Sequence, residues 1–563
     1  MSMNSKYKQM GAFLLASTMV FSMTACGNSS TKKDDVSNEN KTENTAGTKT
    51  DPAKETAAVD GEVTPGWQQH ADDKVTLTWY MHFSWFTAPW GENLVSKAIT
   101  EETGVNIQFV IPAGNEAEKL NSLIASNTLP DLVTLGWYEQ QVPQIIDAGL
   151  VYALDELATQ YDPYFFEVAS PERIGWYTQE DGHIYGYPNS SYTPTDSEKY
   201  DNIASNQTFL VRKDIYEAIG SPDMTTPEGF KAAVKAAKEK FPEINGQSLI
   251  PIGAHEFTNI GNNSFDSFLC NFLAVPFEKD GKAHDRYRDP ELMIWLKTFR
   301  ELGQEGYLTD DVFIDKRAQM DEKLAQGRYF CMLYQYTDIV SQQKLLYEKD
   351  PNSIYIAVDG PKNSKAEDYR VPNSGIAGWT LTMISKNCKR PDRAIELLSY
   401  LISEHGQHMV WLGVEGVTWD MVNGKPTMKQ EVRDLLQTDR ATFDKQYGAD
   451  VCYWMLQDNA MALSWAVETP DPMGQIERWT YPYTVSTSEY LTTIAADTEE
   501  ADIKNKVDNE WGVVLPKLLL AKSDEEFDKI LADFNKKMEE WGYAKVLDKQ
   551  TELININKEK LGL

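Results

Sequence analysis

Two groups of aromatic residues stand in connections where rings could bind a ligand. The run HFSWFTAPW at 82–90 follows the strand-like segment VTLTWYMH at 75–82 and precedes a helical pattern near 90–102. The second group, Gly136–Trp137–Tyr138, follows the strand-like segment DLVTLG at 131–136. Rings in such places either pack into the core or cover an apolar face of a ligand. Trp79 lies within a strand and fits the core, whereas Trp85, Trp90 and Trp137 fit ligand contact better.

The sequence offers little other chemistry. It contains no GxSxG, HExxH or phosphate-loop motif, and its seven histidines are scattered. His405 and His408 are interpreted as a solvated helix face rather than a metal pair. Beyond Cys26, four cysteines remain, without CxxC spacing, so no metal or redox motif is expected: Cys270, Cys331, Cys388 and Cys452. The sequence leaves open whether these four cysteines form disulfides or are buried free thiols. We therefore expect no metal, no cofactor and no catalytic residues.

The elements around these rings predict an α/β fold. Strand-like segments at 75–82, 105–112 and 131–136 alternate with helical patterns at 90–102, 116–126 and up to Gly149. Such alternation with short loops favours a parallel sheet. Ligands of open parallel sheets bind outside the carboxyl ends of the strands, which is where both aromatic groups fall.

The N-terminus has the features of a secretion signal. Lys6 and Lys8 precede the apolar run GAFLLASTMVFSM, which is too short to span a membrane, and the run ends in TACGN. This resembles a bacterial lipoprotein signal of residues 1–25, with Cys26 as the lipidated residue (palmitate included) of the mature protein. Double acylation provides the two chains that stable anchoring needs. An ordinary secretory peptide with an incidental cysteine is the alternative.

A polar segment follows the cysteine. Residues 28–66 are rich in Ser, Thr, Asn, Asp, Lys and Glu and contain no aromatic residue. Such a composition cannot bury enough apolar surface to fold, so residues 26–66 are predicted to be a flexible tether. Its ends would lie roughly 35 Å apart.

The charge of the chain excludes some partners. Without residues 1–25 the chain has 52 basic and 85 acidic side chains, a net charge of −33. Repulsion makes nucleic acid and anionic lipid poor partners, so membrane contact is expected through the lipid anchor alone. The same balance favours neutral over acidic ligands, although a local cluster of Arg and Lys could still bind an acidic one.

Five motifs, in order, resemble one protein family. They are TGVNIQFV with NSLIASNTLPDLV, AGLVYALDEL, DGHIYGYPN, FLVRKDIYEAIG with TTPEGF, and KRPDRAIELLSYLISEHGQ. Together, behind a lipoprotein signal, they resemble the family 1 extracellular solute-binding proteins of ABC importers, in the long lipoprotein subgroup that handles oligosaccharides. The resemblance covers nearly all of the chain after Cys26.

The resemblance implies a two-lobe, periplasmic-binding-protein-like α/β fold with hinge strands and a ligand cleft between the lobes. The chain would cross between lobes near 187–207, 373–380 and 413–418. Lobe 1 would comprise 67–205 plus 378–415, and lobe 2 would comprise 206–377 plus 416–563. The implied partners are an oligosaccharide and the permease subunits of the importer. The implied location is the extracellular face of the bacterial cytoplasmic membrane, and the protein is expected to be a monomer.

The family position also suggests ligand-binding residues. The nine candidates are Trp85, Phe86, Trp137, Asn189, Trp379, Trp419, Glu415, Asp420 and Trp454. Their rings would cover the C–H faces of sugars, and their polar groups would pair with hydroxyls. Some long family members bind calcium after the helix that ends here in KAAKEKFP. The corresponding segment, PEINGQSLIP, has too few carboxylates for calcium, so no metal is expected there.

Two other functions stay open. A lipid-anchored glycoside hydrolase would carry the same aromatic residues and needs two carboxyl groups about 5–10 Å apart. The 85 acidic residues permit such a pair, but no motif singles one out. A peptide or amino-sugar receptor on the same fold is the other alternative.

Overall fold

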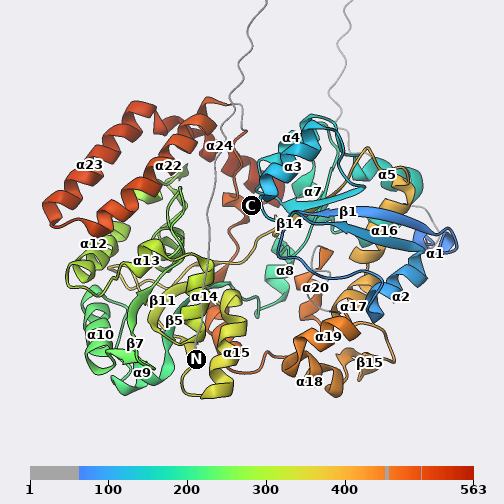
Figure 1. Ribbon diagram of the computed structural model, residues 1–563. Helices are drawn as coiled ribbons and strands as arrows, with labels where there is room; N and C mark the ends of the chain where they lie inside the picture. Colours follow the sequence, from blue (N-terminus) through green and yellow to red (C-terminus); the bar gives the residue numbers. More distant parts are fainter. Residues whose placement is uncertain (1–62, 450–455, 496–497) are drawn as a thin grey trace, which may run out of the picture. The chain divides into compact units, whose positions relative to one another are not determined.

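In the computed structural model (Figure 1) the described residues are 63–449, 456–495 and 498–563. The predicted signal peptide, Cys26 and nearly all of the tether lie outside these ranges, as does Trp454. Residues 62–563 form one unit. Within it, two separate β-sheets each have their own hydrophobic core.

The first sheet has five strands in the order β2-β1-β3-β14-β4. Its strands are β1 (Val75–Met81), β2 (Val105–Val110), β3 (Leu132–Gly136), β4 (Tyr187–Pro188) and β14 (Thr380–Ile384). β1 pairs with β2 and β3 in parallel, as the alternating pattern predicts, whereas β14 runs antiparallel to β3. The start of β14 therefore lies beside the end of β3, with Thr380 opposite Gly136.

The helices of the first lobe follow local sequence signals. For example, the Asn93 side chain caps the start of α2, and Gly104 ends it in a left-handed conformation. The helices are α1 (Gly66–Gln69), α2 (Leu94–Thr103), α3 (Glu116–Ala125), α4 (Gln141–Asp147), α5 (Leu154–Tyr161), α6 (Phe165–Val168), α7 (Pro171–Tyr177), α16 (Pro391–Ile402) and α17 (Glu404–Leu412). α16 is the late helix that was expected to return to this lobe, and its apolar residues lie in the first core.

The second sheet has four strands in the order β12-β5-β11-β8. They are β5 (Gln207–Arg212), β8 (Ile250–Gly253), β11 (Tyr329–Gln335) and β12 (Tyr355–Ala357). Around them lie α9 (Lys213–Ala218), α10 (Pro227–Lys240), α11 (Ser267–Phe272), α12 (Pro290–Gln304), α13 (Asp311–Ile314), α14 (Arg317–Ala325), α15 (Val340–Lys349) and α21 (Met473–Thr480). The PEINGQ segment forms a small hairpin of β6 (Glu243–Ile244) and β7 (Gln247–Ser248).

The first two expected crossings join the two sheets. Residues 189–206, which include α8 (Pro194–Lys199), connect β4 of the first sheet to β5 of the second. Residues 373–379 connect β13 (Val371–Pro372), which pairs with β17 (Thr484–Val485), to β14.

The third crossing lies later in the chain than the expected position near 413–418. The segment after α17 contains β15 (Trp419–Val422), β16 (Lys425–Met428), α18 (Gln430–Thr438) and α19 (Arg440–Gln446). Its residues Val432, Phe443 and Leu456 lie in the first core, and Trp465 packs with Leu412. Ile476 then lies in a cluster of the second sheet. The chain therefore crosses between 465 and 476, because the segment's apolar residues complete the first core.

Three C-terminal helices extend the second core. They are α22 (Glu499–Leu520), α23 (Asp524–Trp541) and α24 (Tyr543–Leu561), drawn in red in Figure 1. Trp511, Phe534 and Val546, one from each helix, are buried in that core. α24 also reaches the first lobe, where the Lys560 amine donates to the carbonyl of Trp176 at 3.1 Å.

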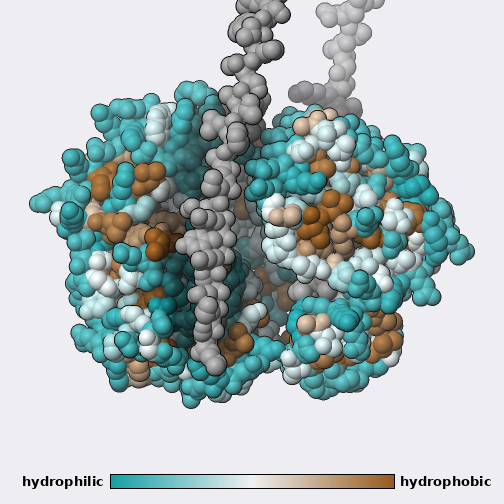
Figure 2. All heavy atoms as spheres, in the orientation of Figure 1, coloured by the Kyte–Doolittle hydropathy of each residue, from teal (hydrophilic) through white to brown (hydrophobic). Residues whose placement is uncertain are grey.

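The surface of the described residues is mostly polar. On the face in Figure 2 hydrophilic residues predominate, and hydrophobic ones form small separate patches. No helix in the described ranges is long and apolar enough to cross a membrane. Cys270, Cys331 and Cys388 are buried free thiols.

The packing of α19 leads to a stability prediction. Replacing the buried Phe443 with Ala leaves a cavity in the first core, so we expect the free energy of unfolding to fall by about 3–5 kcal/mol in urea. The matched control is Tyr161→Ala, whose ring is 38% exposed on α5. A loss in Phe443→Ala no larger than in this control would contradict the assignment of α19 to the first core.

Candidate functional site

Three connections meet at one edge of the first sheet. The loop 82–92 leaves the carboxyl end of β1, and residues 137–140 leave the carboxyl end of β3. Because β14 is antiparallel to β3, its entering residue Trp379 reaches the same edge. The Trp137 amide donates to the Trp379 carbonyl at 3.3 Å, which joins two of the three connections. The fold thus gathers rings that are up to 296 positions apart in the sequence, from Phe83 to Trp379.

We call these rings the aromatic surface: Phe83, Trp85, Trp137, Tyr138 and Trp379. The Trp85 and Trp379 indoles are nearly parallel, at 5° between planes and 6.1 Å between centroids. The Phe83 ring touches both, at 5.6 Å from Trp85 and 5.4 Å from Trp379. Trp85 is 56% exposed and Tyr138 is 53% exposed, whereas Phe83, Trp137 and Trp379 are half-buried, so the surface is partly open to solvent. Flat exposed rings of this kind suit contact with the apolar face of a ligand.

Hydrogen bonds and close backbone approaches fix these rings. The Trp137 indole N–H donates to the Gly378 carbonyl at 3.1 Å. Gly378 has φ +69°, and a Cβ there would lie 2.0 Å from the Asn189 carbonyl oxygen. The Tyr138 ring packs over Gly136 so closely that a Cβ at that position would lie 2.7 Å from the ring. Glycine is therefore required at position 378, by space and by its left-handed backbone, whereas a side chain at position 136 would displace the exposed Tyr138 ring.

Ionisable groups lie behind the rings. His82 is buried, with its Nδ1 atom 3.1 Å from the Tyr80 hydroxyl and its Nε2 atom 4.0 Å from a Glu139 oxygen. Burial lowers the pKa of His82 below its usual value, although Glu139 and Glu116 act in the opposite direction. Burial also raises the pKa of the Tyr138 hydroxyl, which is hydrogen-bonded to Trp379. The His82 ring and the Tyr138 hydroxyl are thus neutral at pH 7.

Three of the nine residues suggested by the sequence contribute to the aromatic surface. These are Trp85, Trp137 and Trp379. Phe86 instead is 3% exposed in the first core, where its ring meets Phe109 edge-on at 5.0 Å. Asn189 is 1% exposed, and its side-chain oxygen accepts from the Thr380 amide at 2.7 Å. This hydrogen bond holds Asn189, at the start of the first crossing, against Thr380, which follows the second crossing.

The remaining candidates lie near the end of α17. Trp419 is buried, and its indole N–H donates to the Gly413 carbonyl at 2.9 Å. Glu415 and Asp420 are exposed in the same region, and an Asp420 oxygen lies 3.5 Å from the Lys429 amine. Trp454 lies outside the described residues. The contacts of Trp419 are those of a packing residue, because its polar atom is already bonded to the backbone.

Two members of the aromatic surface were not among the sequence candidates. Tyr138 follows Trp137 in the same turn, and Phe83 stands two positions before Trp85. Their exposure follows from loop geometry, for which a single sequence gives no direct signal. In the described ranges, no three His, Cys, Asp or Glu side chains are arranged to hold a metal ion.

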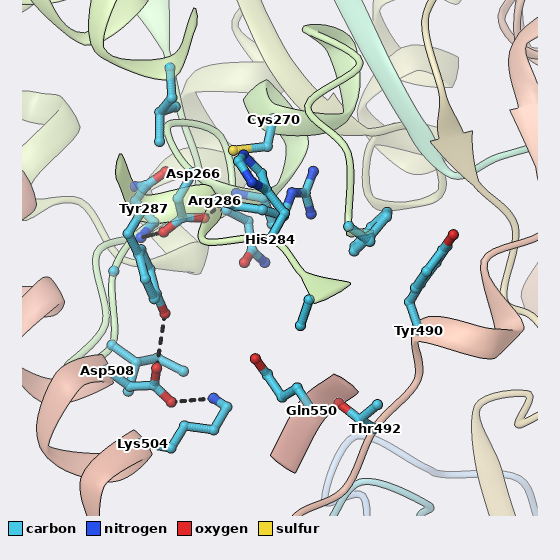
Figure 3. Close-up of a pocket in the computed structure, with 18 of the residues that line it drawn as sticks. Asp266, Cys270, His284, Arg286, Tyr287, Tyr490, Thr492, Lys504, Asp508 and Gln550 are labelled. Carbon is cyan, nitrogen blue, oxygen red and sulfur yellow. Dashed lines mark hydrogen bonds and ion pairs between the residues drawn. The ribbon is translucent and has the colours of Figure 1, made fainter. Parts of the chain in front are cut away.

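The second lobe contains a cavity of about 620 Å³ (Figure 3). Its lining residues lie between 255 and 292 and between 490 and 554, that is, around α11, α22 and α24. The labelled polar side chains come from several segments: Asp266, His284, Arg286, Tyr287, Tyr490, Thr492, Lys504, Asp508 and Gln550. None of these polar residues could be predicted from the sequence, because their spacing follows no motif.

Two sheets with their own cores, joined by several crossing segments, define a two-lobe solute-binding fold. Known proteins with similar sequences and structures agree with this assignment. A family model described as "Bacterial extracellular solute-binding protein" matches residues 95–418. This is more than half of the chain, which therefore belongs to that family.

Relatives identified by sequence are distant. Lipoprotein LipO of Bacillus subtilis is 22% identical over 345 residues, which are 58% of this chain and 64% of LipO. A fructooligosaccharide ABC transporter substrate-binding protein, FusA of Streptococcus pneumoniae, is 25% identical over 240 residues, which are 39% of this chain and 42% of FusA. The chain thus spans less than two thirds of the length of either relative.

Solved structures can be aligned with a larger part of this chain than these two relatives. The pneumococcal FusA structure with kestose has a TM-score of 0.65 and 16% identity, covering 86% of this chain and 100% of that one. The alginate-binding protein AlgQ2 without calcium has a TM-score of 0.64 and 20% identity, with coverage of 86% and 99%. At these identities the likeness establishes the fold. The family and these neighbours are binding proteins rather than enzymes.

The buried His82 gives a prediction for pH dependence. Unfolded histidine binds a proton near pH 6.5, and burial lowers the pKa in the native protein. The unfolded state then holds more protons as pH falls below 6.5, so His82 makes folding less stable in acid. NMR titration should place its midpoint below 6.5.

His183 is the matched control. Its Nδ1 atom lies 2.8 Å from an Asp155 oxygen, and this hydrogen bond raises the His183 pKa. Its contribution to stability is present below pH 6.5 and is lost as pH rises through its native pKa. The Asp155→Asn variant should bring its midpoint back toward 6.5 and leave that of His82 unchanged. A His82 midpoint at or above 6.5 would contradict the buried placement.

Proposed function

We propose that this protein is the substrate-binding lipoprotein of an ABC transporter, which captures oligosaccharides in an aromatic-lined cleft between its lobes and delivers them to the permease. The observation that carries the proposal is the parallel stacking of the exposed Trp85 indole with the half-buried Trp379 indole in a solute-binding fold. A relative supports it, since FusA is a fructooligosaccharide ABC transporter substrate-binding protein.

The aromatic surface would supply most of the affinity. A sugar presents C–H groups on its faces and hydroxyls around its rim. Covering about 100 Å² of apolar area at ~25 cal/mol/Å² stabilises the complex by roughly 2.5 kcal/mol. This corresponds to a gain in affinity of nearly two orders of magnitude for each well-covered sugar unit. The entropic cost of ordering the ligand and the side chains must be subtracted from this gain.

Closure of the two lobes would couple binding to delivery. Contacts to both lobes exist together only when the cleft is shut, so an oligosaccharide shifts the hinge equilibrium toward the closed state. The crossings at 189–206 and 373–379 would carry the hinge. The permease would then recognise the closed form, and the ligand would be released chemically unchanged.

We also propose that the protein is anchored at the outer face of the bacterial cytoplasmic membrane. Cleavage after Ala25 would leave Cys26 as the lipidated N-terminus, and the tether to Gly66 would hold the lobes near the outer face of the cytoplasmic membrane. The LipO relative, itself described as a lipoprotein, supports this. The protein would act as a monomer and would not bind nucleic acid.

Replacing the paired indoles should weaken binding. We expect Trp85→Ala and Trp379→Ala each to reduce affinity for the best-bound sugar by about 10- to 100-fold. The measurement is calorimetry against fructo-, xylo-, manno-, gluco- and galacto-oligosaccharides. Tyr161→Ala, which removes an exposed ring of the same lobe outside the aromatic surface, is the control and should bind normally.

The same samples test the enzyme alternative. Chromatography after prolonged incubation should return the oligosaccharide intact, with stoichiometric binding and no turnover. Hydrolysis products would favour the glycoside hydrolase. Binding that is insensitive to both tryptophan substitutions would contradict the assigned surface.

Ligand-driven closure predicts a measurable change in size. Small-angle scattering of the wild-type chain should show a smaller radius of gyration when the bound oligosaccharide is added at saturation. Trp379→Ala at the same sugar concentration should contract less, because fewer molecules are occupied. A profile that stays the same at proven saturation would contradict a closing hinge.

A further inference from the structure

One buried arginine of the first lobe holds two of the segments that lead to the second lobe. Arg173 lies in α7 and is 6% exposed. It donates to the hydroxyl of Ser191, in the first crossing, at 3.2 Å and to the carbonyl of the same residue at 2.9 Å. It also forms two hydrogen bonds with the carboxylate of Asp458, at 2.5 and 3.2 Å. Asp458 belongs to the segment that leads into the third crossing.

The second crossing is tied to the same arginine through Ser191. The Ser191 hydroxyl accepts from Arg173 and donates its own proton to the Ile376 carbonyl at 2.6 Å. Tyr177, which also belongs to α7, donates from its hydroxyl to the neighbouring Ala377 carbonyl at 2.7 Å. One short helix thus contacts segments of all three connections between the lobes. We call Arg173, Ser191, Ile376 and Asp458 the clamp.

The ion pair within the clamp is shielded from solvent. The side chains of Arg173 and Asp458 are 7% and 14% exposed. Asp196, in α8 of the first crossing, adds a second carboxylate at 3.6 Å. Burial acts to lower the pKa of Arg173, but the charge of Asp458 outweighs it, so the pKa lies above its usual value. Removing the arginine would leave a buried carboxylate without a partner, which is costly.

A second buried residue joins the other ends of the crossings in the second lobe. Ser205, at the end of the first crossing, is fully buried. Its hydroxyl donates to the Pro372 carbonyl at 2.7 Å, and its amide donates to the Thr480 hydroxyl at 3.1 Å. Pro372 directly precedes the second crossing, and Thr480 lies in α21, which follows the third. The three crossings are therefore held together at both ends.

The parts of the crossings that can bend lie between these two groups. They are residues 192–204, 373–375 and 466–472. The middle span is the shortest. At its end, the Ile376 amide donates at 2.9 Å to the hydroxyl of Ser488, in η5 (Ser488–Tyr490), which packs on α24 of the second lobe. The two lobes therefore stay in contact beside the middle span.

The clamp also reaches the aromatic surface. The Trp379 amide donates to the Asn189 carbonyl at 3.2 Å, and Asn189 lies two positions before Ser191. Ile376 lies three positions before Trp379 on the same crossing. Arg173 thus holds both pieces of chain that fix the Trp379 ring. A ring that is already fixed loses less entropy when a ligand binds.

We propose that Arg173 is a positioning residue for ligand binding, which clamps the three crossings to the first lobe. The clamp holds Trp379 in place and confines the movement of the lobes to residues 192–204, 373–375 and 466–472, with 373–375 as the pivot. The proposal rests on the proposed binding of a sugar by lobe closure and identifies the residue that guides it.

Hydrogen exchange of the mature protein without ligand tests the clamp. Arg173→Lys keeps the positive charge but lacks the planar fork that contacts Ser191 and Asp458 together. It should raise the exchange rates of peptides that cover Tyr192, Trp379 and Asp458, one for each connection, together by about 10-fold or more. Mass spectrometry measures these rates.

Arg393→Lys is the matched control. Arg393 is buried in the first lobe and forms an ion pair with Glu396 in α16, away from the crossings. Its replacement should leave exchange in the crossings unchanged. Ser191→Ala keeps the ion pair of Arg173 and should raise exchange in peptides covering 376–379 by about 3- to 10-fold, even if Arg173→Lys does not fold.

Calorimetry with the best-bound oligosaccharide tests the role in binding. Arg173→Lys should weaken affinity by about 3- to 10-fold, because Trp379 is then ordered only on binding. Arg393→Lys should bind as wild type. In a Trp379→Ala background, Arg173→Lys should weaken binding by less than about 2-fold, because the ring that it positions is absent. An equal loss in both backgrounds would overturn the positioning of Trp379.

The exchange results separate this inference from the proposed function. Unchanged exchange in Arg173→Lys, or an increase at Asp458 alone, overturns the shared clamp. An equal increase throughout β1 and β3 overturns it as well, because it would indicate a general role in the core. If a sugar still binds with dependence on Trp85, the proposed function stands. A joint increase in a protein that binds no saccharide supports the clamp of the crossings and overturns its role in binding together with the proposed function.

Discussion

The candidate site depends on the pairing of β14 with β3 in the first sheet. β14 enters from the second lobe and runs antiparallel to β3, so its first residues meet the carboxyl end of β3. Gly378 permits this entry, because its left-handed backbone passes so close to Asn189 that no side chain fits. The same pairing brings Trp379 beside the rings that follow β1 and β3. A hinge connection and a wall of the candidate site are therefore one structural feature.

The two lobes offer different recognition chemistry. The first presents exposed rings whose contacts are non-directional and scale with apolar area. The second encloses polar groups whose contacts are directional and whose burial penalises a wrong partner. Combining the two is an efficient way to bind saccharides, since apolar faces give affinity and a few polar groups give selectivity.

The division of the chain between the lobes follows from packing rather than from order along the sequence. Residues after Gly413 were expected to leave the first lobe, yet Val432 and Phe443 fill its core. The hairpin of β15 and β16 with α18 and α19 is thus an addition to that lobe. The C-terminal helices serve the second lobe in the same manner, through Trp511 and Phe534. They also form one side of the cavity of that lobe.

The sequence by itself determined the α/β class, the first strands and helices, and the edge at which Trp85 and Trp137 lie. These follow from hydrophobic periodicity and from the rule that loops after parallel strands share an edge. Only the tertiary structure decided that Phe86 is core and that Tyr138 and Phe83 join the aromatic surface. Those outcomes depend on which side of a loop faces the sheet and on contacts between segments up to 300 residues apart. Local spacing does not encode such contacts.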